Sequence, residues 1–270
     1  MRVAVGRYPA VNSPKPNAHR RSAAFATPFP KDRMSEPNPM PAFRLGCGTV
    51  VCGYRLLRRL GHGWEGTSYL AHEEFSGVIR RVKFYRSMDG QHADQVGHVA
   101  ATYDRLAHTG AVPTYHHMGV WQRGRRSIPF LVFDYIDGQP LNKMLTPGRW
   151  RRGWTDSKAV TVLAALAGKL AAIHDTGLAI GDFPHGHNIL VTPEQDAVWC
   201  DITAGWLDEP FIDQAADAAN FFTILDMLAM HQPESPLIVT VCRRLERFRD
   251  RRRWRGGFAR IATILETMPG

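Results

Sequence analysis

The sequence predicts an α+β fold in two lobes, an antiparallel sheet with one helix followed by a smaller, mostly helical lobe. From Leu45 to about Ile136, short apolar runs separated by glycines are typical of a twisted antiparallel sheet. After Gly138 the apolar residues recur at the spacing of helices. Polar and acidic residues that can carry chemistry gather where the two regions meet. We therefore expect a functional cleft between lobes at residues 45–137 and 138–270.

The sheet lobe is expected to contain five strands and one helix. Apolar residues recur every three or four positions between Asp94 and Ala107, which predicts the helix there. The strands are expected at Tyr54–Leu60, Thr67–His72, Val78–Tyr85, Thr114–Val120 and Ile128–Tyr135.

The helical lobe is expected to open with a long helix that Thr155 or Asp156 caps. Its apolar stripe runs from Val160 to Ile173, and Gly177 ends it. A short hairpin, a strongly apolar helix and a last helix with an arginine-dense, basic face complete the lobe. We place these elements at Ile189–Val191 with Ala197–Cys200, at Ala215–Met230 and at Cys242–Arg260.

Composition narrows the class of protein. The 270 residues include 34 Lys and Arg against 25 Asp and Glu, and the resulting net charge of +9 favours polyanionic partners such as phosphate-bearing ligands. The four cysteines form no CxxC pair, which speaks against a zinc knuckle or a disulfide framework. The longest apolar stretch, Val160 to Ile173, is too short to cross a bilayer and contains Lys169. We therefore expect no transmembrane segment and a cytoplasmic location.

Residues 1–44 are rich in Pro, Ala, Ser and Arg, and their only acidic residues are Asp32 and Glu36. Such a segment buries too little apolar surface to offset its ordering entropy, so we predict a disordered extension. An over-long start, with Met34 or Met40 as the true first residue, and a targeting or export segment are the alternatives.

A G-x-G-x-x-G run at Gly61, Gly63 and Gly66 lies between the first two predicted strands. Glycines permit a tight turn and let backbone N–H groups approach phosphate oxygens without interference from a Cβ. The dinucleotide-binding version of this pattern needs a helix after the third glycine. Here Thr67–Leu70 continues as a strand, which favours a phosphate-covering hairpin over that fold; an ordinary glycine-rich turn is the alternative.

Lys83 lies in the third predicted strand, close behind the glycine run. A lysine within an apolar strand is costly unless its ammonium finds an anion. Facing the same cleft as the glycines, it is suited to hold phosphate oxygens. The alternative is a lysine on an edge strand that points into water.

Oxygen-bearing side chains cluster in the second lobe. The long helix ends before a loop that presents Asp182 and Asn188, and the hairpin then delivers Asp201 beside them. Two carboxylates and one amide oxygen suit Mg²⁺, which prefers oxygen ligands and substrate phosphates. Asp182 is also placed to accept a proton from an attacking hydroxyl.

In this order and spacing, the segments resemble the protein-kinase superfamily over roughly residues 50–230. Tyr54–Gly61 and Gly66–Ala71 resemble the glycine-rich loop of bacterial Ser/Thr kinases. Phe130–Gly138 resembles the hinge between the lobes, whose backbone reads adenine.

Three aspartates extend the resemblance into the second lobe. The segments around Asp182 and Asp201 resemble the catalytic loop and the metal-binding D-F-G, and Asp217 resembles the aspartate that braces the catalytic loop. The resemblance implies that ATP and Mg²⁺ bind in the cleft. It assigns Gly61, Gly63, Gly66 and Lys83 to the phosphates, Asp134 and Ile136 to adenine, Asp182 to the base, and Asn188 and Asp201 to Mg²⁺.

The chain also departs from the family pattern. Five residues rather than four separate Asp182 from Asn188, which leaves His187 at the expected position of the metal-binding amide. The predicted helix contains no glutamate for Lys83; Val99 stands there instead, and Asp94 or Asp104 would serve only with a shifted helix.

Three more departures concern the cleft and the substrate. Arg81 stands where a small residue normally roofs the adenine, and Glu65 at the tip of the glycine loop would lie uncomfortably near phosphates. Between Asp201 and Asp217 there is almost no room for an activation segment, a feature that favours small-molecule and atypical kinases.

The resemblance implies an atypical ATP-dependent kinase that transfers the γ-phosphate to a hydroxyl acceptor, with protein Ser/Thr as the first expectation. A small-molecule phosphotransferase and a pseudokinase, which would bind nucleotide or a partner without turnover, are the alternatives. The arginine-rich segment from Arg243 to Arg255 either docks an acidic partner or is a solvated helix face.

Overall fold

The computed structural model describes residues 44–63, 65–86, 91–145, 154–181, 183–202, 213–249 and 257–268. Residues 1–43, which hold nearly all of the predicted disordered extension, lie outside this set, and so does Asp182. The disorder of the extension and the role of Asp182 therefore stay predictions.

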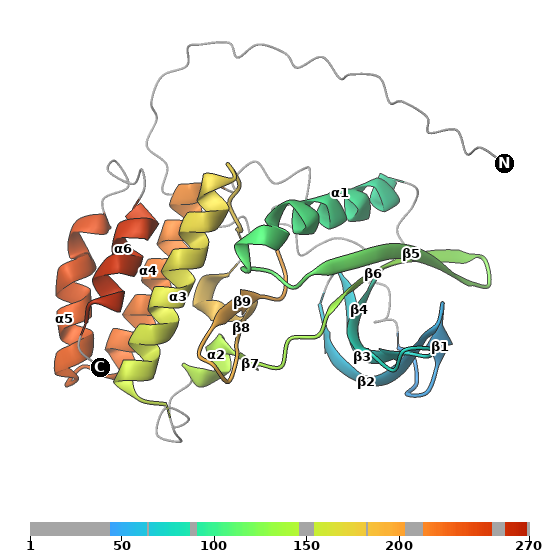
Figure 1. The fold of residues 1–270 in the computed structure, drawn as a ribbon, viewed down its shortest axis with the longest axis horizontal. Coiled ribbons are helices and arrows are strands. Elements are labelled where there is room, and N and C mark those ends of the chain that lie inside the picture. The colour runs from blue at the N-terminus through green and yellow to red at the C-terminus, as the bar shows by residue number, and fades with distance from the viewer. Residues whose placement is uncertain are drawn as a thin grey trace, which may run out of the picture. The chain divides into compact units, whose positions relative to one another are not determined.

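Six antiparallel strands form one sheet in the order β1-β2-β3-β4-β6-β5 (Figure 1). Their bounds are β1 Val50–Val51, β2 Tyr54–His62, β3 Gly66–Glu73, β4 Ile79–Tyr85, β5 Tyr115–Arg123 and β6 Arg126–Asp134. Between β4 and β5 the chain forms α1, Gln91–Leu106, which packs against β5 and β6. The predicted antiparallel sheet with one helix is confirmed, and β1 is a short additional strand.

Successive side chains along each strand point to opposite faces of the sheet, and each face packs in a different hydrophobic core. Val82 and Phe84 of β4 pack on one face, in a cluster of buried residues that the sheet itself supplies. Leu131 and Phe133 of β6 face the other way and join the core that includes α1. Lys83 pairs with Leu131 across β4 and β6, so the same alternation places it on the α1 side of the sheet.

The second region is mostly helical, as predicted. It contains β7 Gln139–Pro140, α2 Leu141–Met144, α3 Asp156–Asp175, β8 Ile189–Val191, β9 Ala197–Trp199, α4 Gln214–His231, α5 Pro236–Leu245 and α6 Gly257–Glu266. Short 3₁₀ helices lie in this region at η3 Pro184–Gly186 and η4 Glu246–Phe248, and a third, η2 Ala107–Thr109, follows α1 in the sheet lobe. Strands β7, β8 and β9 form a small antiparallel sheet, and its β8–β9 hairpin lies next to the sheet lobe.

The central helix α3 begins where the sequence predicts. The Thr155 hydroxyl accepts a hydrogen bond from the Lys158 N–H at 3.2 Å, which satisfies one of the free donors at the helix N-terminus. Of the described helices, α3 is the one whose length and composition alone would let it cross a bilayer. Half of its most apolar window is buried, and α3 packs against α6 as a core helix does (Figure 1).

The predicted single last helix, Cys242–Arg260, is wrong. Helix α5 ends at Leu245, η4 turns the chain, and α6 begins at Gly257, while residues 250–256 lie outside the described set. The reason is packing: Phe258 is buried against Phe221 of α4, with ring centroids 5.4 Å apart. The segment between α5 and α6 is rich in arginine, a good helix former, so local propensity alone would favour the single helix that the sequence predicts.

The close approach of β3 to β4 predicts different responses at two glycines. A Cβ at Gly66 would lie 2.0 Å from the Phe84 carbonyl oxygen, whereas at Gly61 it would meet no heavy atom of the described residues within 4 Å. We expect Gly66→Ala to lower the free energy of unfolding by about 1–3 kcal/mol, because the strands must separate. Urea unfolding checks this, and Gly61→Ala serves as the control with unchanged stability. Equal stability of the two variants would contradict the packing described here.

Candidate active site

A cavity of about 560 Å³ lies between the six-stranded sheet and the β8–β9 hairpin. Its volume is in the range of sites that bind small molecules and cofactors. Every predicted site residue that the structure describes lines this cavity. These residues are Gly61, Gly63, Gly66, Lys83, Asp134, Ile136, Asn188 and Asp201.

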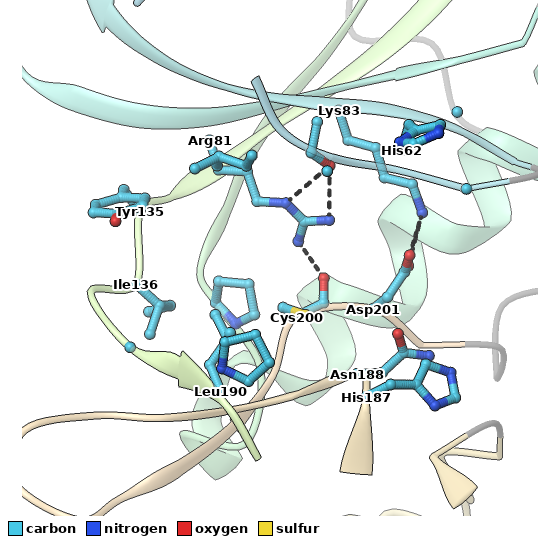
Figure 2. A pocket seen from close by; sticks show the side chains of 18 of the residues that line it. His62, Arg81, Lys83, Tyr135, Ile136, His187, Asn188, Leu190, Cys200 and Asp201 are labelled. Carbon is cyan, nitrogen blue, oxygen red and sulfur yellow. Dashed lines mark hydrogen bonds and ion pairs between the residues drawn. The ribbon is translucent and has the colours of Figure 1, made fainter. Parts of the chain in front are cut away.

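The polar end of the cavity is an ion cluster around Lys83, whose residue is only 4% exposed. The Lys83 ammonium donates to Asp201 Oδ1 at 2.7 Å and Oδ2 at 2.8 Å, and to Glu65 Oε2 at 2.6 Å; Figure 2 shows the contact between Lys83 and Asp201. Burial opposes the charged form of Lys83, but the negative charge of Asp201 and its neighbours outweighs burial and holds the pKa of Lys83 well above its ordinary value. The predicted meeting of Lys83 and Asp201 across the cleft is thus present.

Glu65 enters this cluster from the glycine-rich turn. Its burial raises the pKa of its carboxyl group, and the nearby Asp201 adds to this effect, while Lys83 opposes it. The sequence places the negative charge of Glu65 unfavourably near phosphates but does not predict that Glu65 pairs with Lys83. In the part of the chain that the structure describes, the carboxylates that ion-pair with Lys83 are those of Glu65 and Asp201.

Asp201 is held in place through the residue before it. The Cys200 carbonyl accepts hydrogen bonds from the Arg81 guanidinium, as Figure 2 shows, and from the Tyr103 hydroxyl at 3.4 Å. Arg81 also donates to the Ser68 hydroxyl and stacks 5.3 Å from the centre of the Phe133 ring. Arg81 therefore fills the inner part of the cleft, where the resemblance implies a small residue, and it ties β4 to the segment that carries Asp201.

Asn188 lies directly beside this segment. The Cys200 N–H donates to the Asn188 carbonyl at 2.9 Å, which continues the β8–β9 ladder by one step. In the preceding loop, His185 of η3 adopts a left-handed φ of 62°. Both Asn188 and His187 line the cavity. The assignment of the metal-binding amide to Asn188 stays a prediction.

The backbone immediately before Asp182 is anchored to helix α4. The buried Asp217 carboxylate at the start of α4 accepts the N–H groups of Ile180 and Gly181, each at 2.9 Å, and contacts His174 at 2.9 Å. The Asn220 amide donates to the Gly181 carbonyl at 2.9 Å. Asp217 thus braces the loop as its resemblance implies.

The opposite end of the cavity is the segment after β6. Asp134, Tyr135 and Ile136 all line the cavity, and Figure 2 shows Tyr135 and Ile136 beyond Arg81. The Asp134 side chain pairs with Arg80 and with His116 at 2.7 Å. Burial opposes the charged carboxylate, but the hydrogen bond from His116 and further polar contacts lower the pKa of Asp134. These contacts direct the Asp134 carboxylate toward Arg80 and His116.

The donor atoms near Asp201 fit a hard cation. Asp201 and Asn188 offer carboxylate and amide oxygens to the same cavity, and Mg²⁺ is commonly held by one or two such ligands together with substrate phosphates. Within the described ranges, no group of three or more His, Cys, Asp and Glu side chains could hold a metal ion by itself.

A six-stranded sheet with one helix, a helical lobe and a polar cleft between them define the protein-kinase-like fold. Among the solved structures that match are two of the Mycobacterium tuberculosis PknI kinase domain. A single mutant of that domain matches with a TM-score of 0.53 and 20% identity, over 72% of this chain and 80% of that chain. A double mutant matches with a TM-score of 0.60 and 18% identity, over 83% of this chain and 98% of that chain. No protein-family model and no curated protein matches.

The bracing role of Asp217 predicts a large loss of stability on its removal. Asp217→Ala leaves two buried N–H groups and His174 without their acceptor, so we expect the free energy of unfolding to fall by about 3–5 kcal/mol. Asp213→Ala, which removes an exposed cap of the same helix, should cost only about 1 kcal/mol. Chemical denaturation measures both, and similar losses would show that Asp217 acts merely as a helix-terminal acid.

Proposed function

We propose that this protein is an ATP-dependent phosphotransferase that passes the γ-phosphate to a hydroxyl acceptor. The observation that carries the proposal is the meeting of the Lys83 ammonium and the Asp201 carboxylate at 2.7 Å inside a nucleotide-sized cavity. In protein kinases a lysine of the sheet pairs with the phosphates and an aspartate of the other lobe holds Mg²⁺, and Lys83 and Asp201 are suited to these two roles. The kinase-like fold supports this assignment.

In this proposal the cleft binds ATP along its length. The backbone of Asp134 and Ile136 reads adenine, and the turn that contains Gly61, Gly63 and Gly66 covers the phosphates. Lys83 pairs with the α- and β-phosphate oxygens. Asp201 and Asn188 would hold Mg²⁺, which supplies positive charge against the charge that develops on the phosphate oxygens.

The chemical step is an in-line displacement. The acceptor hydroxyl oxygen forms a bond to the γ-phosphorus, the bond from that phosphorus to the bridging oxygen breaks, and ADP leaves. Asp182 is proposed to accept the hydroxyl proton. Asp217 and Asn220 act on this step indirectly, because they hold the backbone before Asp182. Catalysis then consists mainly of positioning and charge neutralisation.

We propose a protein Ser/Thr hydroxyl as the acceptor. The matching structures are of a kinase domain, which favours a hydroxyl acceptor of this general kind. The segment 203–212, on which the short activation segment falls, lies outside the described residues. A small-molecule acceptor is the alternative outcome that the transfer assay distinguishes.

A binding module without turnover is the second candidate, and Arg81 favours it. Its guanidinium occupies the inner cleft and is fastened to the Cys200 carbonyl, where it would narrow the space for adenine. In that case the chain would bind a nucleotide or a partner but transfer no phosphate. The assay below separates the two candidates.

A docking site for an acidic partner at the arginine-rich segment and a cytoplasmic location are further proposals. Arg243, Arg244 and Arg247 are exposed, as such a docking site requires. Arg249 instead pairs with Asp226 and Glu246, so it contributes less free positive charge.

Removal of either charge at the cleft should abolish transfer. We expect Lys83→Met and Asp201→Asn each to reduce kcat/KM by at least about 100-fold, because the first removes the cation proposed to pair with the phosphate oxygens and the second removes the carboxylate proposed to hold Mg²⁺. The assay is incubation with γ-labelled ATP and Mg²⁺, with label traced to the chain itself, to added proteins or to metabolites. Lys169→Met, which removes a lysine paired with Asp196 away from the cleft, is the matched control. Equal labelling by all variants would remove Lys83 and Asp201 from the mechanism, and no labelling by the wild type with intact ATP binding would support the binding module.

A further inference from the structure

The second carboxylate that binds Lys83 comes from the glycine-rich turn and not from helix α1. The helix α1 presents buried residues such as Val99 and Tyr103 to the core beneath the sheet, and it contains no glutamate. Its two acids, Asp94 and Asp104, are both exposed. The second carboxylate on the ammonium comes instead from Glu65, at 2.6 Å. The shifted helix that would bring an acid of α1 to Lys83 is therefore not what this structure shows.

The backbone of Glu65 is fastened to the end of β4. Its carbonyl accepts the Arg86 N–H at 2.8 Å, and the Arg86 guanidinium donates to the Gly63 carbonyl at 3.0 Å. The turn is also closed by a hydrogen bond from the Gly63 N–H to the Gly66 carbonyl at 2.9 Å. The Glu65 side chain is only 15% exposed. A side chain on so constrained a turn is already oriented toward Lys83.

The proposed chemistry of the cleft requires a second carboxylate on Lys83. Asp201 has both oxygens on Lys83 here, yet in the proposed function it must also serve Mg²⁺. Glu65 is then the carboxylate that continues to hold the ammonium and to balance its buried charge. A lysine held on one side presents its remaining protons to the phosphates in a defined direction.

We infer that Glu65 is a positioning residue that replaces the missing helix glutamate, and that the glycine-rich turn, rather than α1, orients Lys83. This inference rests on the proposed function for its catalytic consequence. The salt link itself, between the turn and β4, is independent of turnover. The orientation of Lys83 then depends on the Glu65 carboxylate of the turn and not on an acid of α1.

The catalytic test compares Glu65→Gln with three controls in the full chain. We expect Glu65→Gln to lower kcat about 10- to 100-fold while the Kd for ATP, measured by calorimetry, changes less than about threefold, as for loss of positioning rather than of binding. Glu65→Asp should recover part of kcat. Glu74→Gln, which removes an exposed glutamate paired with Arg55, and the pair Asp94→Asn with Asp104→Asn should leave kcat unchanged.

Two kinetic results would overturn the inference. One is an increase in kcat, or ATP binding at least about tenfold tighter in Glu65→Gln, which would make Glu65 an obstruction in the phosphate site. The other is a loss of kcat in the α1 variants as large as that in Glu65→Gln, which would return the role to the helix.

Amide hydrogen exchange tests the link without any turnover. In the absence of nucleotide, we expect exchange in residues 61–66 to accelerate at least about fivefold in Glu65→Gln and equally in Lys83→Met, with no further increase in the double variant. Exchange in α1 should stay unchanged. Unaltered exchange in the turn, or additive effects of the two substitutions, would overturn the link. If the wild type transfers no phosphate, the proposed function fails, and this measurement still decides whether Glu65 fastens the turn to Lys83.

Discussion

The buried ammonium of Lys83 is the constraint on which the rest of the structure depends. A charged group on an interior strand costs several kcal/mol unless carboxylates reach it. The described chain supplies them from two distant places, the glycine-rich turn and the hairpin. Asp201 is 118 positions away from Lys83 along the chain, so the contact forms only when the β8–β9 hairpin is seated beneath the sheet. The ion cluster therefore couples the folding of the two lobes to the formation of the cleft.

Arg81 reinforces this coupling from the same face of β4. It binds the Cys200 carbonyl while Lys83 binds the next residue, so two cations of one strand hold two successive residues of the opposite lobe. Together with Glu65 the cluster is close to electrically balanced. In the proposed function, an incoming triphosphate would disturb this balance, which is a physical reason for it to enter with a divalent cation.

The remaining parts of the site are held by backbone contacts to rigid elements. Asp217 and Asn220 of α4 fix the chain before Asp182, and the Asn188 carbonyl continues the β8–β9 ladder. The glycine-rich turn is fixed to β4 in the same way through Arg86. The altered motifs of this chain thus do not leave a loose cleft. Lys83 pairs with Glu65 of the turn instead of an acid of α1, and the Arg81 guanidinium fills the inner cleft.

Much of this architecture follows from local features of the sequence. Short apolar runs separated by glycines predict the five longer strands, and helical spacing after a capping Thr155 or Asp156 predicts α3. The cost of burying a lysine predicted that Lys83 would meet an anion, and the order of the acidic segments pointed to Asp201. The positions of Glu65 and Arg81 were recognised as departures from the family pattern.

The tertiary structure alone decided which groups meet at those departures and where the last helices divide. Glu65 and Arg81 find their partners through a turn closed on β4 and a hairpin from the opposite lobe. Phe258 ends the continuity of α5 and α6 because its burial against α4 outweighs local helical preference. Local periodicity describes only neighbours along the chain, whereas each of these outcomes is set by contacts between residues that are far apart in it.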